Sequence, residues 1–439
     1  MLRSPAALIV SLASLALSPR VARAETMRLE DAVKLALENN ERARKAPLRV
    51  EVADAQVDRA REAFFPTLNG SGSSTYHPGA KGPNPATAGA LQLNQPLFSP
   101  SAFVQFSQQL HNREAERWGG VQDRRDVAFD TAKAFIQALT AEGLLKSAQR
   151  KLAASKTNLE TATARAQAAL TSTNDVTKAE LQLATSEGQV ANAEGNVRRT
   201  YITLGFLVGR TVDGPLVPPD NTTHAAQHFE QARTNTVKNA LARRGHMVAA
   251  AQDRRPDVKS LHEKNQGLEA SANEPLWRLL PTLSASGQVR FTVDPLPSEK
   301  GVDEQAGLNL SWPIFDAGFR YSDRKQRLAQ LESSRLDEKL LRRSVQNDIE
   351  LALAALRAAR GNFTAATAAA ESAQKNADET NVLYQQGLAK ALEVSDANDQ
   401  QFNAEVTREA AKLSMEQAYL DLRNALGFGP VEEPEARSQ

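Results

Sequence analysis

The second half of this chain repeats the order of short segments found in its first half, and this duplication constrains the fold more than any other feature. Four landmarks recur in the same order, displaced by 215 to 218 positions. The matched pairs are 65–72 with 280–287, 91–98 with 308–315, 170–176 with 388–394, and 201–204 with 419–422. Self-similarity at a fixed distance indicates that one structural unit is present twice. A turn-rich linker, Asp213 to Asn221, separates the copies.

Each copy predicts a helix, a strand pair, a long helix and a shorter helix. Apolar and alanine residues recur at helical spacing over 29–64, and Pro66 disfavours helical geometry at Phe65. Residues 103–170 and 319–386 contain no proline and predict rods of ~100 Å, at ~1.5 Å per residue. A shorter helix, 176–208 or 394–426, follows each rod, so we expect the chain to turn back as an antiparallel hairpin.

The strand pair of the second copy has one apolar and one polar face. Its apolar positions are Val289, Phe291, Leu308, Leu310 and Trp312. They alternate with polar residues such as Ser286, Gln288 and Arg290. We expect the apolar set to face lipid and the polar set a lumen, because lipid tolerates no exposed charge at mid-depth. Four strands per chain are fewer than the about eight of a closed barrel, so several copies would have to pool their strands.

The first 24 residues have the pattern of a cleaved secretory signal. Arg3 precedes an apolar stretch, 6–17, and an Ala-Arg-Ala site ends at Ala24. Beyond Leu17 no apolar run approaches the ~20 residues of a membrane-spanning helix. We therefore divide the chain into a signal peptide (1–24), a first repeat (25–212, strands 66–98, hairpin 101–209), a linker (213–236), a second repeat (237–428, strands 281–315, hairpin 319–427) and a polar tail (429–439).

Composition and motifs argue against several classes of function. The absence of cysteine excludes disulfide scaffolds and thiolate chemistry, and 53 basic against 52 acidic residues argue against nucleic-acid binding. No phosphate loop, nucleophile elbow or zinc-binding His-Glu-x-x-His occurs, so we expect neither an enzyme nor a cofactor. His224 and His228 have the spacing of a metal-binding helix face but lie in the polar linker without an obvious third ligand. We predict linker surface there and no metal site.

The duplicated order of these segments resembles the TolC-like outer-membrane efflux proteins. The resemblance covers about residues 27–428 and rests on the Pro-Thr-Leu strand starts at 66 and 281, the strand ends 95–98 and 312–315, and the turns at Leu170 and Gly387. It implies a mainly α protein with a small β part. Three copies would form a twelve-stranded β-barrel in the outer membrane, continued by a periplasmic α-helical barrel.

That family implies a passive export duct of a tripartite efflux or type I secretion system. The implied partners are two further copies of the chain, outer-membrane lipid, a periplasmic adaptor protein and an inner-membrane pump. Two alternatives stay open. One is a coiled-coil tether of the cell envelope without channel activity, and the other is a duct for secreted polypeptides instead of small toxic compounds.

The resemblance also assigns residues to a periplasmic gate. Asp175 lies at the first helical turn, and Tyr384 matches a tyrosine that bonds to this aspartate across neighbouring hairpins. Glu393 and Asp396 match two carboxylate rings that line the closed entrance. The alternative is that Tyr384, Glu393 and Asp396 are ordinary solvated helix residues. The exposed tips would contact the adaptor through Thr171, Ser172, Leu388, Ala389 and Lys390. The sequence departs from the family at Ala389, where a basic latch residue is expected.

Overall fold

The computed structural model describes residues 26–76, 86–219, 226, 237–293 and 301–431. The predicted signal peptide, both histidines His224 and His228, the loops between paired strands and most of the polar tail lie outside these residues. The division of the chain at 24, 212, 236 and 428 therefore stays a prediction.

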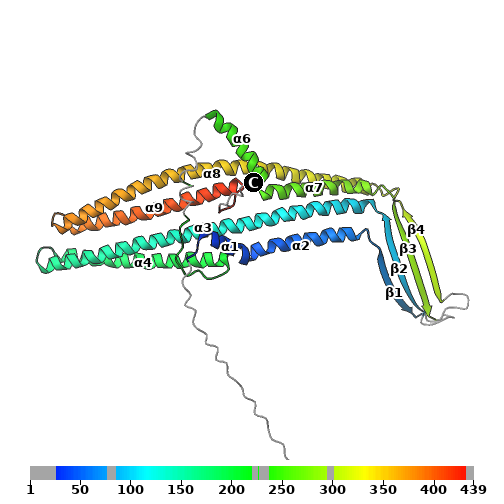
Figure 1. Ribbon diagram of the computed structural model, residues 1–439, viewed down its shortest axis with the longest axis horizontal. Helices are drawn as coiled ribbons and strands as arrows, with labels where there is room; N and C mark the ends of the chain where they lie inside the picture. The colour runs from blue at the N-terminus through cyan, green and yellow to red at the C-terminus, as the bar shows by residue number, and fades with distance from the viewer. Residues whose placement is uncertain (1–25, 77–85, 220–225, 227–236, 294–300, 432–439) are drawn as a thin grey trace, which may run out of the picture.

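The elements follow one another in the same order twice (Figure 1). The first series is α1 (Leu29–Asn39), α2 (Glu41–Glu62), β1 (Thr67–Thr75), β2 (Ala86–Phe98), α3 (Pro100–Gln167) and α4 (Thr173–Val208). The second is α6 (Val237–Arg254), α7 (Pro256–Trp277), β3 (Thr282–Val293), β4 (Val302–Ser311), α8 (Phe319–Gln385) and α9 (Ala391–Ala425). The mainly helical, duplicated fold predicted from the sequence is confirmed.

The predicted single helix over 29–64 is wrong, because the chain breaks at Asn40 between α1 and α2. Asn40 has an extended backbone, and its side chain accepts a hydrogen bond from the Arg42 amide at 3.0 Å, which caps α2. Its Nδ2 atom donates to the Leu207 carbonyl at 3.1 Å. The second copy breaks at Arg255, where Pro256 disfavours helical geometry in the preceding residue. Each break lies beside the end of the repeat's last helix.

The four strands form one antiparallel sheet in the order β1-β2-β3-β4, so the middle pair joins the two copies. Leu91 lies opposite Val289, and Leu308 lies opposite Ala285. Directly opposed residues share a face, so Val289, Phe291, Leu308 and Leu310 lie on one side, as the alternation predicts. The other side carries Gln92, Gln288 and Gln305 in line, and Arg290 opposite Asp303.

The expected end of the fourth strand at residue 315 is wrong, because β4 ends at Ser311. Trp312 lies just beyond it, exposed to solvent, and its indole nitrogen donates to the Leu279 carbonyl at 2.9 Å. The following residue, Pro313, has no amide hydrogen with which to extend the ladder. Trp312 therefore belongs to the junction between the sheet and the helices and not to the strand.

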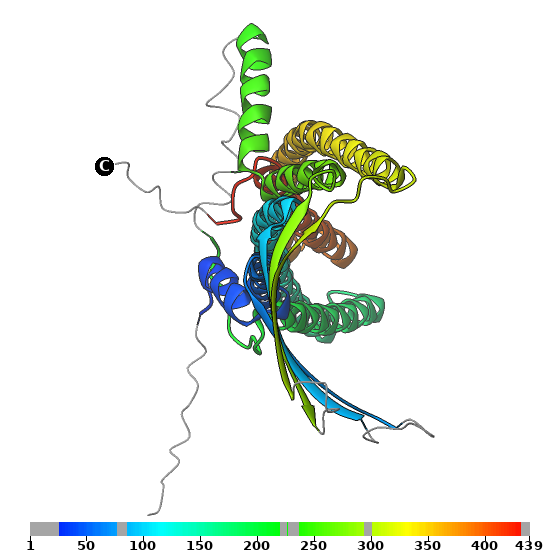
Figure 2. The same ribbon diagram turned by 90° about the vertical axis from the view of Figure 1, so that its right-hand side faces the viewer.

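The helices form a long, curved layer that continues from the sheet (Figures 1 and 2). At the sheet end α2, α3, α7 and α8 lie side by side, and at the far end α3 pairs with α4 and α8 with α9 as two hairpins. At ~1.5 Å per residue, the 68 residues of α3 and the 67 of α8 each span ~100 Å.

Two apolar clusters hold this layer together in the middle of its length. One packs Phe135 and Ile136 of α3 against Leu204 and Val208 of α4 and residues of α1. The other packs Val345 of α8 against Met415 and Leu422 of α9. Elsewhere alanine dominates the buried helix faces, so neighbouring helices approach closely without a thick core.

Candidate functional site: the helical turns and the contacts behind them

The two helical turns lie at the end of the molecule opposite the sheet (Figure 1). In the first, the Leu170 amide donates to the Arg165 carbonyl at 2.8 Å, and Ala169 has a φ of 55°. In the second, the Leu388 amide donates to the Leu383 carbonyl at 2.8 Å, and Gly387 has a φ of 81°. In both turns the helix therefore ends at a residue with left-handed backbone geometry, and the amide of the following residue bonds back to a carbonyl of the last helical turn. They present Leu170 and Leu388 to solvent, with 76% and 73% of their surface exposed.

The predicted tip residues surround these turns, and two of them form hydrogen bonds with residues of the same turn. The Thr171 hydroxyl donates to Asp175 at the start of α4. The Lys390 amide donates to Glu393 Oε2 at 3.0 Å, so the Glu393 side chain caps the start of α9. Ser172, Leu388 and Lys390 are exposed. Glu393 and Asp396 are also exposed and stand one helical turn apart, so they share a face of α9.

Tyr384 and Asp175 are not brought together within one chain. Tyr384 is buried near the end of α8, and its hydroxyl has no hydrogen-bond partner among the described residues. The guanidinium of Arg165 lies 4.6 Å from the centre of its ring. Arg165 belongs to α3, so this cation–π contact links the two hairpins. Sequence reasoning missed Arg165, because nothing in the local pattern pairs it with a residue 219 positions away.

Behind the turns, a set of polar contacts joins α9 to the first hairpin. Lys151 Nζ lies 2.7 Å from Asp399 Oδ1, and Gln182 Nε2 donates to the same oxygen at 2.7 Å. Arg150 Nη2 lies 2.6 Å from Glu405 Oε2. We call Arg150, Lys151, Gln182, Asp399 and Glu405 the inter-hairpin seam. Burial tends to raise the pKa of Glu405, but hydrogen bonds from Ser147 and Arg150 outweigh it and hold that pKa below its ordinary value.

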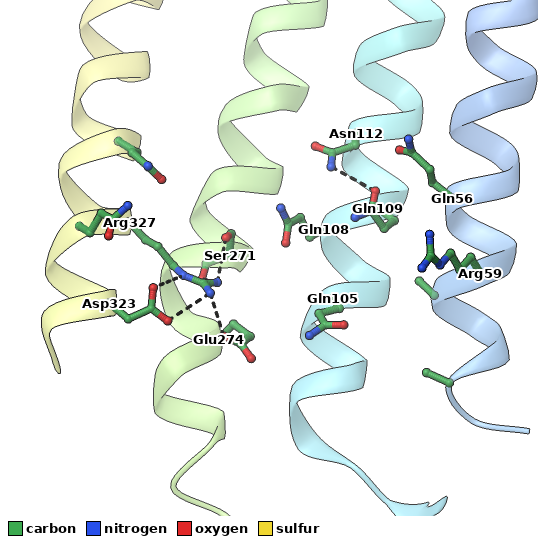
Figure 3. Close-up of a pocket in the computed structure, with 14 residues that line it drawn as sticks. Gln56, Arg59, Gln105, Gln108, Gln109, Asn112, Ser271, Glu274, Asp323 and Arg327 are labelled. Atoms are coloured by element: carbon green, nitrogen blue, oxygen red, sulfur yellow. Dashed lines mark hydrogen bonds and ion pairs between the residues drawn. The ribbon is translucent and has the colours of Figure 1, made fainter. Parts of the chain in front are cut away.

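A polar recess lies at the other end of the helices, next to the sheet (Figure 3). It has a volume of about 830 Å³ and is lined by α2, α3, α7 and α8, with glutamine side chains such as Gln56, Gln105 and Gln108. The buried carboxylate of Glu274 lies 2.7 Å from Arg278 and 3.3 Å from Arg327, which also pairs with Asp323 at 2.9 Å. Its lining is therefore mostly polar and charged.

The described residues contain no group of three or more side chains placed to hold a metal ion. Within the same residues, every helix is too short or too polar to cross a membrane.

Comparison with known proteins identifies this architecture. The sequence profile described as "Outer membrane efflux protein" matches residues 32–210 and 247–428, which are most of both repeats. The chain belongs to the outer membrane efflux protein family. It is accordingly an efflux channel of the outer membrane, and the matches give no support to a tether without channel activity. The family consists of channel proteins and not of enzymes.

Curated relatives of this efflux protein align over most of their length. Outer membrane efflux protein BepC of Brucella suis is 24% identical over 431 residues, which are 95% of this chain and 89% of the relative. Outer membrane protein TolC of Escherichia coli is 23% identical over 408 residues, 89% of this chain and 80% of the relative.

Solved channels share the fold of this efflux protein. CusC superposes with a TM-score of 0.76 at 17% identity, covering 91% of this chain and 92% of that one. The open state of the MtrE outer membrane channel of Neisseria gonorrhoeae superposes with a TM-score of 0.73 at 20% identity, covering 92% and 89%.

Proposed function

We propose that three copies of this protein form a passive export duct that docks to a periplasmic adaptor and receives cargo from an inner-membrane pump. The open sheet is the observation that carries this proposal. Its outer strands β1 and β4 each leave one edge unpaired among the described residues, and one face of the sheet carries Leu91 of β2, Val289 of β3 and Leu308 of β4, with Glu304 of β4 opposite Val289. Lipid offers no partner for an open edge, so strands from neighbouring copies must close it.

Three copies would supply twelve strands, and β4 of one copy would pair with β1 of the next. Val289, Phe291, Leu308 and Leu310 would then face lipid, while Gln288 and Arg290 would face the lumen. Trp312, just beyond β4, would lie at the membrane interface, where an indole can keep its N–H bonded while its ring is in lipid. The helices of about 100 Å would extend the duct across the periplasm.

The turns would form the periplasmic entrance. Repetition of Glu393 and Asp396 in three copies would place six carboxylates around one constriction, and such rings favour cations. The buried Tyr384 hydroxyl, which lacks a partner among the described residues, would find its acceptor in Asp175 of a neighbouring copy. The exposed tips, with Thr171, Ser172, Leu388, Ala389 and Lys390, would meet the adaptor.

Single-channel recording of the purified protein tests the duct directly. After outer-membrane fractionation and crosslinking to count the copies, the protein is placed in a planar lipid bilayer. We expect a trimer with discrete, cation-selective conductance steps. A protein that fractionates with the outer membrane but never conducts ions would overturn the proposal.

A further inference from the structure

The hairpin helices of the two repeats match residue for residue, at a spacing of 218 positions. Val127 of α3 and its equivalent in α8, Val345, are both fully buried. Gly209 and Gly427 follow the ends of α4 and α9 with φ values of 75° and 82°. A contact that joins the two repeats within the chain therefore has an equivalent pair of positions, at which the second repeat can join the first repeat of another copy.

Within the chain, the end of α9 lies against α3 of the other repeat. The half-buried guanidinium of Arg125 donates to the carbonyl oxygens of Asn424 and, at 3.1 Å, of Phe428. Leu420, one turn earlier in α9, is fully buried in the apolar cluster that contains Phe135 of α3. A cation that binds the last carbonyl groups of a helix stabilises its C-terminal end.

The end of α4 has the equivalent carbonyl groups but no such contact. They belong to Phe206 and Arg210, and no hydrogen bond to either oxygen is found among the described residues. Ile202 is the equivalent of Leu420, and 64% of its surface is exposed. The C-terminal end of α4 is therefore left without the arginine and the apolar cover that the end of α9 has.

The equivalent arginine lies on α8, at the opposite edge of the helical layer. Arg343 matches Arg125, is exposed, and makes no hydrogen bond or ion pair with the described residues. Leu353, the equivalent of Phe135, packs against the second apolar cluster. Figure 1 shows α8 along one edge of the layer and α4 along the other. These two edges would meet only when copies of the chain stand side by side.

We propose that the end of α4 in one copy docks against α8 of the next copy, where Arg343 binds the carbonyl groups of Phe206 and Arg210 and Ile202 packs beside Leu353. The partner is a second copy of this chain, and the contact joins two different surfaces, so that three such contacts close a ring. This inference rests on the proposed duct and adds a contact between helices to the pairing of strand edges.

The contact between copies carries less charge than its equivalent within the chain. Lys133 of α3 and Asp421 of α9 form an ion pair at 2.6 Å, and their equivalents are Leu351 and Thr203. Leu351 is 61% exposed in the single chain. Copies that meet here would bury apolar surface without removing an ion pair from water, which favours the association of separately exported chains.

The first test joins the two helices covalently, and no native cysteine interferes because the chain has none. In Leu351→Cys with Thr203→Cys, a short bifunctional thiol reagent should join different copies, so that denaturing gels show covalent dimers and trimers. In Lys133→Cys with Asp421→Cys, the equivalent contact lies within one chain, and the product should migrate as a monomer. Each single variant should also migrate as a monomer, because the contact joins two different helices.

The second test removes the charge that caps α4. Arg343→Met keeps the apolar stem, and we expect the trimer to dissociate in detergent about tenfold faster, the change that ~1.4 kcal/mol spread over three lost caps produces. Arg343→Lys should dissociate at an intermediate rate, because an ammonium can still bind the carbonyl groups. Lys156→Met, at an exposed lysine of α3, is the control and should dissociate as the natural protein does.

The outcomes separate this contact from the duct. A native gel first shows whether the natural protein and each variant form trimers. Trimers in which Leu351→Cys with Thr203→Cys gives no product larger than a monomer, or which Arg343→Met leaves as stable as before, overturn the contact and leave the duct intact. Loss of the trimer in Arg343→Met alone supports the contact. A natural protein that stays monomeric overturns the proposed assembly itself.

Discussion

Single residues at the turns perform structural tasks that their exposure alone does not reveal. Glu393 caps α9, Thr171 binds Asp175, and Arg165 covers the ring of Tyr384. A side chain assigned to a gate can therefore also stabilise a helix end. Variants at these positions have to remove the charge or the hydroxyl without removing the cap or the packing.

Tyr384→Phe should raise the resting conductance and admit bulky antibiotics. The phenyl ring keeps its contact with Arg165, and the change removes only a buried hydroxyl, whose proposed hydrogen bond to a neighbouring copy would be worth about 0.5–1.5 kcal/mol. Conductance at rest and antibiotic sensitivity of cells are the measurements. Equal values for Tyr384→Phe and the natural protein would show that the hydroxyl has no acceptor in the assembly.

Glu393→Gln combined with Asp396→Asn should weaken cation selectivity while the entrance keeps its shape. Glutamine can still accept the hydrogen bond from the Lys390 amide, whereas Glu393→Ala would remove this bond and cost ~1 kcal/mol of helix stability. Reversal potentials across a salt gradient measure the selectivity. Unchanged reversal potentials would mean that these carboxylates do not line the entrance.

At the scale of elements, the strands show most directly what alternation can predict. Val289 and Gln288 are neighbours in β3 but point to opposite faces of the sheet. Val289→Arg should impair membrane insertion by ~2–4 kcal/mol if the residue lies near mid-membrane, and Gln288→Arg should be tolerated in a polar lumen. The amount of heat-stable oligomer in outer-membrane fractions measures insertion. Equal losses from both changes would show that the two faces are assigned wrongly.

Helix ends offer a stability prediction with a control in the same element. Gly209 ends α4 with a φ of 75°, and a Cβ atom there would lie 2.7 Å from Asn39 Cβ. Gly209→Ala should therefore lower the free energy of unfolding by at least ~1–2 kcal/mol. Gly188→Ala, within α4 and with no atom within 4 Å of the added Cβ, should raise it by ~0.5–1 kcal/mol. Thermal unfolding followed by circular dichroism compares the stabilities of the two variants. A Gly209→Ala variant that is more stable than the natural protein would show that this position does not require glycine.

The elements also show where sequence reasoning stopped. Proline-free stretches and the internal repeat were enough to predict the two long helices, the hairpins and the strand faces. The break at Asn40 was missed because asparagine interrupts no helical pattern by itself, and its side chain is held by Leu207, far away in the chain. The contacts of Lys151 with Asp399 and of Arg165 with Tyr384 depend on how two hairpins pack, which no local pattern specifies.

At the scale of the whole molecule, the two ends have different tasks, and the tips can be tested for contact with a partner. Photo-crosslinkers at Ser172 and Ala389 should capture a periplasmic adaptor, because a tube receives cargo from a partner at its periplasmic end. Tyr76, exposed at the far end of β1, is the control site. Mass spectrometry of the crosslinked products identifies the partner. Capture from Tyr76 alone would place the docking surface at the wrong end.

The unpaired edges of β1 and β4 have a consequence for how the protein reaches its final state. A single exported chain carries two strands that are each ready to pair with any other extended backbone, so wrong pairing competes with the correct one. Folding of the sheet and association of the copies are then one event, and its rate should rise more steeply than in proportion to the concentration of unassembled chains. Overproduction of the protein would therefore increase aggregation through pairing at the same strand edges. We therefore expect chaperones that cover β1 and β4 before the copies associate to reduce this aggregation.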